Sequence, residues 1–153
     1  MNKYSEKAMN YFSEGYNCAQ SVVLTFADEV GMDKKTALML SSSFGGGMGR
    51  LREVCGAVSG MFIIAGLLSG YSAPDDADGK KEHYRLIQEL AEKFRERNGS
   101  IICRELLGNT DGNPGSYIPE KRTDEYYKKR PCKELVGDAA EIIGEYYEEN
   151  FRK

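Results

Sequence analysis

The sequence predicts an all-α fold: one domain, residues 1–153, with about six or seven helices around a buried central helix rich in glycine and alanine. Three observations support this. Apolar residues recur at helical spacing along most of the chain. No segment shows the strict alternation of a half-buried strand. The apolar run Val54–Leu68 lies between amphipathic segments, which need a common surface to bury. A chain of 153 residues that is 41% hydrophobic suffices for one core.

Capping signals divide the first half of the chain. Asn17 and Asp33 stand where N-cap residues are expected, and Gly15 and Gly31 stand where helices should stop. The apolar stretch that follows the glycine run reads as a buried helix with Cys55 in its first turn. The expected helices of this half are residues 3–14, 18–30, 33–43 and 54–69.

The second half begins with a long amphipathic helix from about Asp76 to Arg97, which Asn98-Gly99 should end. Ser100 is expected to cap a short helix that carries Cys103. Residues 109–125 are rich in Gly, Pro, Asn and Asp and read as a long loop of the kind that often carries function. The last helix should start near Pro131, because proline suits a first turn.

Charge and hydropathy exclude several classes of protein. The net charge of −3 is small and the chain has no basic stripe, so we expect no nucleic-acid partner. The longest apolar run is about 15 residues, shorter than the roughly 20 of a membrane span. The first residues lack the apolar core of a signal peptide, which predicts a cytoplasmic protein with reduced thiols.

The four cysteines occur in similar settings, each at or within a turn of an expected helix N-terminus. There the free N–H groups and the helix dipole favour a thiolate, which both redox chemistry and metal binding require. If the helix starts converge, the thiols form a Cys₄ site suited to an Fe–S cluster or Zn. The alternative is that each cysteine is a small buried hydrophobe. The candidate catalytic and metal-binding residues are Cys18, Cys55, Cys103 and Cys132.

The glycine run at residues 45–49 requires a reason, because glycine loses the most backbone freedom on folding. One interpretation is a nest of N–H groups that holds an anion, with Arg50 and Arg52 nearby. The other is close packing of the loop against helices. After Cys55, small residues would allow a close helix neighbour or a flat cofactor against the backbone. The candidate cofactor-binding residues are Gly45, Gly46, Gly47, Gly49, Arg50 and Gly56.

These motifs resemble the C_GCAxxG_C_C family of small, redox-active bacterial and archaeal proteins. The resemblance rests on G-Y-N-C-A-Q-S-V around Cys18, F-G-G-G-M-G-R-L-R-E-V-C-G-A-V-S-G around Cys55, Cys103 before R-E-L-L-G, and Cys132. It spans residues 4–145. The central motif reads C-G-A-x-x-G, whereas the family label places Gly before Cys. The resemblance implies redox activity and extends to split-Soret cytochrome c, which suggests electron transfer. Covalent haem is not implied, because the chain has no C-x-x-C-H site.

Two classes of function follow. The first is a redox or electron-transfer protein that works with an unidentified redox partner. Its cysteines would form two thiol pairs or hold an Fe–S cluster, and in the thiol version Cys55 is the expected nucleophile because it combines a helix start with a flexible glycine approach. The second is a non-catalytic module, either a Zn–Cys₄ site or a helical interaction protein with inert cysteines. Whether the protein is an enzyme stays open. The small-residue face after Cys55 and the tyrosines of the last helix predict a homodimer.

Overall fold

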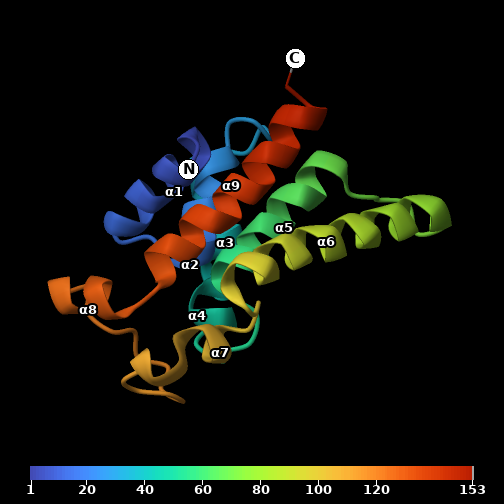
Figure 1. Cartoon of the computed structure of the whole chain (residues 1–153). Coiled ribbons are helices and arrows are strands. Elements are labelled where there is room, and N and C mark those ends of the chain that lie inside the picture. Colours follow the sequence, from blue (N-terminus) through green and yellow to red (C-terminus); the bar gives the residue numbers. More distant parts are fainter. Residues whose placement is uncertain (153) are drawn as a thin grey trace.

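The computed structural model describes residues 1–152, and within them the fold is all-α, as the sequence predicts (Figure 1). The only β pairing among these residues is a single bridge between Val54 and Ile102. No helix of the described chain has both the length and the apolarity needed to cross a membrane. The helices are α1 (Lys3–Ser13), α2 (Cys18–Phe26), α3 (Lys34–Ser41), α5 (Gly56–Ser69), α6 (Ala77–Asn98), α7 (Cys103–Leu107), α8 (Asp124–Lys129) and α9 (Cys132–Asn150), and a short segment α4 (Gly45–Met48) precedes α5.

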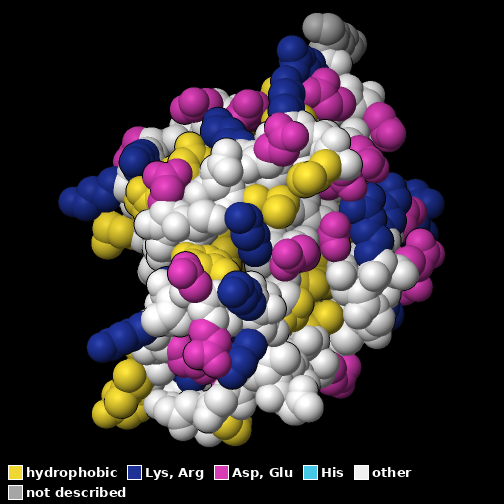
Figure 2. All heavy atoms as spheres, turned by 60° about the vertical axis from the view of Figure 1, so that its left-hand side comes forward, with side chains coloured by type: hydrophobic (Ala, Val, Ile, Leu, Met, Phe, Trp, Pro, Cys, Tyr) yellow, Lys and Arg dark blue, Asp and Glu magenta, His cyan; other side chains and the backbone are white. Residues whose placement is uncertain are grey.

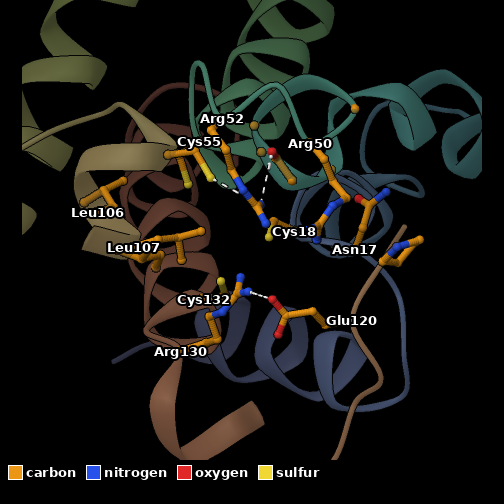
Figure 3. A pocket seen from close by; sticks show the side chains of 18 of the residues that line it. Asn17, Cys18, Arg50, Arg52, Cys55, Leu106, Leu107, Glu120, Arg130 and Cys132 are labelled. Carbon is orange, nitrogen blue, oxygen red and sulfur yellow. Dashed lines mark hydrogen bonds and ion pairs between the residues drawn. The ribbon is translucent and has the colours of Figure 1, made fainter. Parts of the chain in front are cut away.

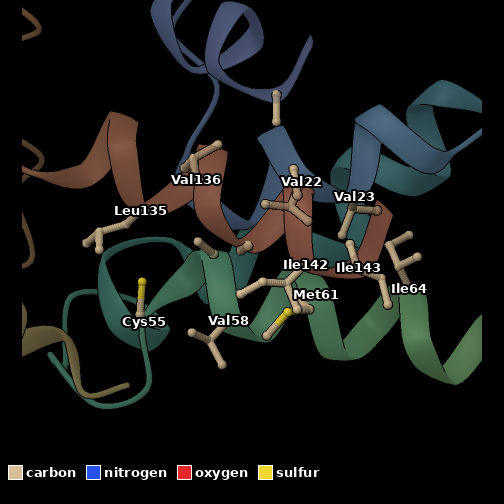
Figure 4. Packing of buried hydrophobic residues seen from close by; sticks show 14 of the residues in the cluster. Val22, Val23, Cys55, Val58, Met61, Ile64, Leu135, Val136, Ile142 and Ile143 are labelled. Carbon is tan, nitrogen blue, oxygen red and sulfur yellow. The ribbon is translucent and has the colours of Figure 1, made fainter. Parts of the chain in front are cut away.

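Helix α5 lies at the centre, as expected from its apolar sequence. It packs against α2, α6 and α9, while α1 covers α2 and α9. Figure 4 shows Val58, Met61 and Ile64 of α5 in one apolar cluster with side chains of α2 and α9, with Val58 on the side of α5 that points away from these two helices. All three are fully buried. The core is therefore built on the element that the sequence marks as most apolar.

The small-residue face of α5 receives α2. A Cβ atom at Gly60 would lie 2.9 Å from the carbonyl oxygen of Ala19, which is closer than real Cβ contacts allow. Glycine thus lets the two helix backbones touch. The neighbour that the sequence called for belongs to the same chain, so this face is not what a homodimer would use.

Predicted caps are confirmed at two helices. The side chain of Asn17 accepts a hydrogen bond from the N–H of Gln20, and Asp33 accepts one from Thr36. Ser100 is not the cap of α7, and its Oγ accepts from the N–H of Ile102 instead. The reason is that the Val54–Ile102 bridge keeps the chain extended for two more residues.

Helix α8 was not expected in the sequence. It follows the long loop, and Thr123 caps it by accepting from the N–H of Tyr126. Residues 111–123 before it contain no helix, which agrees with the loop predicted there.

Segment α4 turns in the opposite sense to the other helices. Gly46, Gly47, Met48, Gly49 and Arg50 all have positive φ values, between 62° and 72°. L-residues rarely adopt this conformation, and each non-glycine residue in it costs on the order of 1–3 kcal/mol. A Cβ at Gly47 would also lie 2.5 Å from the Cβ of Cys103. Positive φ and close packing together explain the glycine run.

Acidic and basic side chains are interspersed on the face shown in Figure 2, in keeping with the small net charge of −3. The notable concentration of charge is inside a cavity at one end of the bundle.

Candidate functional site

All four cysteines begin helices, as predicted. Cys18 is the first residue of α2, Cys103 of α7 and Cys132 of α9, while Cys55 occupies the N-cap position of α5. Each is a free thiol. The positive end of a helix dipole therefore lies behind every sulfur.

The four thiols line one cavity of about 290 Å³ (Figure 3). It lies at the end of the molecule where α4, α7 and α8 gather (Figure 1). The structure thus brings together cysteines that are up to 114 positions apart in the sequence. The six residues predicted to bind a cofactor also line this cavity: Gly45, Gly46, Gly47, Gly49, Arg50 and Gly56.

Other lining residues were missed from the sequence. They come from the segment between α7 and α9, which was read as a loop of unspecified role. The available signal was the arginines spaced through this stretch. The missed polar and aromatic residues of this segment are Tyr117, Glu120, Arg122, Tyr126 and Arg130, while Arg52, expected beside the glycine run, lines the cavity as well.

The thiols of Cys18 and Cys132 affect each other's ionisation. Hydrogen bonding between the two thiols lowers the pKa of Cys132 and raises that of Cys18, so Cys18 is the proton donor. Although burial opposes it, the positive charge of Arg130 and the Tyr126 hydroxyl lower the pKa of Cys132 further, to about 7. Cys132 is therefore the thiol of the cavity with the greatest thiolate character at neutral pH.

Cys55 behaves differently from the expectation that made it the nucleophile. Burial raises its pKa to about 12, and hydrogen bonds from the N–H groups of Val58 and Ala57 offset this only in part. Burial also raises the pKa of Cys103, although Arg52 acts in the opposite direction. A position at a helix start does not by itself lower the pKa of a thiol, because the cost of desolvating a fully buried thiolate outweighs the stabilisation by the helix dipole.

A buried ion network ties the long loop to the cavity. The Arg52 guanidinium donates two hydrogen bonds to Asp111, at 2.8 and 3.3 Å, and one to the Cys103 sulfur at 3.8 Å. Arg130 contacts Asp111 at 3.5 Å and also pairs with Glu120. Burial opposes the charge of Asp111, yet the hydrogen bonds from Arg52 hold its pKa below the usual value. Asp111 is thus an ionised carboxylate between two buried cations.

Two further arginines line the cavity without a carboxylate partner among residues 1–152. Arg50 donates from Nε to the Ser116 carbonyl at 2.7 Å and from Nη2 to the Asn113 carbonyl at 3.2 Å. Arg122 donates to the carbonyls of Phe12 and Tyr16, at 2.8 and 3.0 Å. Neutral carbonyls satisfy hydrogen bonds but do not cancel charge, so the cavity is cationic.

A closed Cys₄ zinc site does not fit the arrangement. Among residues 1–152, no three His, Cys, Asp or Glu side chains are grouped closely enough to hold a metal ion. A tetrahedral site needs all four sulfurs about 2.3 Å from the metal. Metal binding would require the thiols to move inward from the cavity wall.

Fold and site define an all-α protein in which four helix-terminal thiols surround one cationic cavity. The family model described as "Putative redox-active protein (C_GCAxxG_C_C)" matches residues 16–146, a range that includes all four cysteines. The chain belongs to this family, as its motifs predict. No curated protein and no solved structure has significant similarity to the chain.

Proposed function

We propose that the protein carries out thiol–disulfide exchange, with Cys132 as the attacking thiolate and Cys18 as the resolving thiol. The observation that carries the proposal is that these two thiols line one cavity together with four arginines, while Cys18 lowers the pKa of Cys132. A disulfide between two thiols of one cavity requires their Cα atoms to come within about 7 Å of each other.

The surroundings of Cys132 suit the attacking role. It begins a helix of 19 residues, and Arg130 and Arg122 both favour its ionised form. An attacking thiol works best when its pKa is near the ambient pH, since a lower value reduces nucleophilicity and a higher value reduces the thiolate fraction. A pKa of about 7 meets that condition.

The reaction balances in two steps. The Cys132 thiolate attacks one sulfur of a substrate disulfide, forms a mixed disulfide and releases the other sulfur as a thiolate. Cys18 then loses its proton and attacks Cys132, which forms the Cys18–Cys132 disulfide and releases the second substrate thiolate. The substrate gains two electrons and the protein dithiol loses them. A partner dithiol must return them, which is the role of the unidentified redox partner. A reducing compartment such as the cytoplasm suits a protein that starts as a dithiol.

The second candidate is electron transfer through an Fe–S cluster, which the shared cavity of four thiols favours. Cys18, Cys55, Cys103 and Cys132 would be the ligands, and the arginines of the wall would offset the negative charge of such a centre. A bound cluster would supply one-electron transfer. This candidate requires the inward movement described above, and for that reason thiol exchange is preferred.

Two measurements separate these candidates. Protein purified without oxygen is analysed for iron, sulfide and zinc: thiol exchange predicts a colourless, metal-free protein with titratable thiols, whereas stoichiometric metal would overturn it. Mild oxidation followed by peptide mapping without reductant should then yield a Cys18–Cys132 linkage. The Cys132→Ser variant should lose this linkage and should also lose the thiol that reacts fastest with an alkylating reagent at neutral pH. The Cys103→Ser variant should keep both. A linkage between other cysteines as the main product would contradict the assignment.

A further inference from the structure

We propose that the cavity selects small disulfides that carry a negative charge, and that Arg50 is the residue that binds the substrate's carboxylate. The inference rests on the thiol exchange proposed above and specifies its substrate class. Three observations support it: the charges of the cavity wall, the N–H donor of Arg50 that has no acceptor among residues 1–152, and the size of the cavity.

The charge balance of the wall favours an anion. Four arginines line the cavity, against a single lining carboxylate, Glu120. Asp111 lies behind the wall and neutralises part of the charge of Arg52 and Arg130. Counting both carboxylates, the immediate surroundings keep two excess positive charges. In a partly enclosed site such charges attract anions much more strongly than in water.

Of the two uncompensated arginines, Arg122 is committed to the fold. Its guanidinium stacks on the Phe12 ring at 4.0 Å from the centroid and bonds the carbonyls at the end of α1. Its Nη1 and Nη2 groups both donate to protein acceptors, which a ligand binding at these atoms would have to displace. Arg122 therefore fastens the loop to α1 and contributes charge at a distance.

Arg50 keeps a donor group available. Its hydrogen bonds use Nε and Nη2, and among residues 1–152 its Nη1 has no acceptor. The side chain is half-buried and extends toward the cavity in Figure 3, where it lies near Asn17 and Cys18. The glycines before it place no side chains in front of the guanidinium. A guanidinium with free N–H groups suits a carboxylate, because charge-assisted bonds of this kind are strong and directional.

Size and polarity define the rest of the ligand. A cavity of about 290 Å³ is at the small end of ligand sites, which are typically about 300–1,000 Å³. Leu106, Leu107 and Leu135 form an apolar part of the wall. The site therefore fits a short aliphatic disulfide whose carboxylate lies on Arg50 while a sulfur reaches Cys132.

The test compares three short disulfides of similar size and different charge. They are dithiodipropionate, which is a dianion, hydroxyethyl disulfide, which is neutral, and cystamine, which is a dication. The rate of Cys132 oxidation in the full-length protein is measured at low ionic strength by quenched mass spectrometry. Each rate is divided by the rate of the same disulfide with 2-mercaptoethanol, a thiol without a charged substituent, which removes intrinsic differences in reactivity.

The expected order is dianion, neutral and dication, with a difference of roughly tenfold or more between the extremes at low salt. Added salt should compress this range. Arg50→Gln should reduce the rate with the dianion by a much larger factor than the rate with the neutral disulfide. Arg50→Lys should keep most of the preference because it keeps the charge. Arg95→Gln, an exposed arginine of α6 outside the cavity, is the matched control and should change neither rate.

Three results would overturn the inference in distinguishable ways. Equal normalised rates for the three disulfides would refute charge selection while leaving thiol exchange intact. A parallel loss for neutral and anionic disulfides in Arg50→Gln would show that Arg50 maintains the structure and does not bind the carboxylate. No reaction of Cys132 with any of them would refute the proposed function and this inference together.

Discussion

Removing the Cys18 thiol should raise the pKa of Cys132. The Cys18 hydrogen bond is the largest of the effects that depress this pKa from 9.0 to about 7. Without it, Arg130, Tyr126 and Arg122 still act, so we expect a midpoint of about 8 in Cys18→Ala. At pH 7 the thiolate fraction would then fall from about a half to about a tenth.

The alkylation rate at pH 7 will fall less than this fraction. A thiolate of higher pKa is more nucleophilic, with a Brønsted coefficient of about 0.4–0.5, which returns about threefold of the fivefold loss. The midpoint of the pH–rate profile is therefore the decisive quantity. It is measured by iodoacetamide labelling of Cys132 between pH 5 and 10, roughly two to three units either side of the wild-type midpoint.

Two matched variants complete the experiment. Cys18→Ser keeps a hydroxyl donor and should keep a midpoint near that of the wild type. Cys103→Ala removes another thiol of the same cavity that does not hydrogen-bond Cys132, and it should not raise the midpoint. A profile of Cys18→Ala that coincides with that of the wild type would refute the idea that the Cys18–Cys132 contact activates Cys132.

Three further outcomes are expected. Gly47→Ala should destabilise the fold by about 2–5 kcal/mol in urea unfolding, because strain at positive φ adds to a clash with Cys103. The control variant Gly115→Ala also has positive φ but lies in open space, so it should cost only about 1–2 kcal/mol. The free energy of unfolding should decline above about pH 9, because burial raises the pKa of Cys55 in the folded state to about 12 and the unfolded chain therefore loses this proton at lower pH. A constant melting temperature up to pH 11, roughly two units beyond that onset, would contradict this. Asp111→Ala should leave the buried Arg52 guanidinium without a carboxylate and Arg130 paired with Glu120 alone, at a cost of roughly 3–5 kcal/mol, and should accelerate proteolysis of residues 112–120. An unchanged cleavage rate there would show that the ion network does not hold the loop.

Local signals in the sequence were sufficient for most helices and for the position of every cysteine. Asn17 and Asp33 cap helices through bonds that span three residues, and such short-range chemistry is readable from spacing. The apolar run of α5 likewise identifies the core helix without knowledge of its neighbours.

Long-range effects could not be read in this way. The pKa order of the thiols depends on burial and on arginines that approach from the loop, which is why the nucleophile expected from the sequence, Cys55, differs from the Cys132 of the proposed function. The left-handed turn of Gly46–Arg50 includes two non-glycine residues, for which sequence patterns predict ordinary backbone. Helix α8 is short, with six residues, and its capping bond alone gives a weak signal.

The contact between α2 and α5 at Gly60 has a consequence for how the cavity can adapt. With the two backbones touching, these helices cannot slide closer, and a substitution there would push them apart. Cys18 and Cys55 therefore sit on a fixed wall. Adjustment to a larger ligand should come from residues 108–130, which are tied to the rest of the chain by the Arg52–Asp111 ion pair and by hydrogen bonds of Arg50 and Arg122. The α2–α5 side of the cavity is therefore fixed, and the size of the ligands that the cavity admits depends on how far the loop on the other side can move.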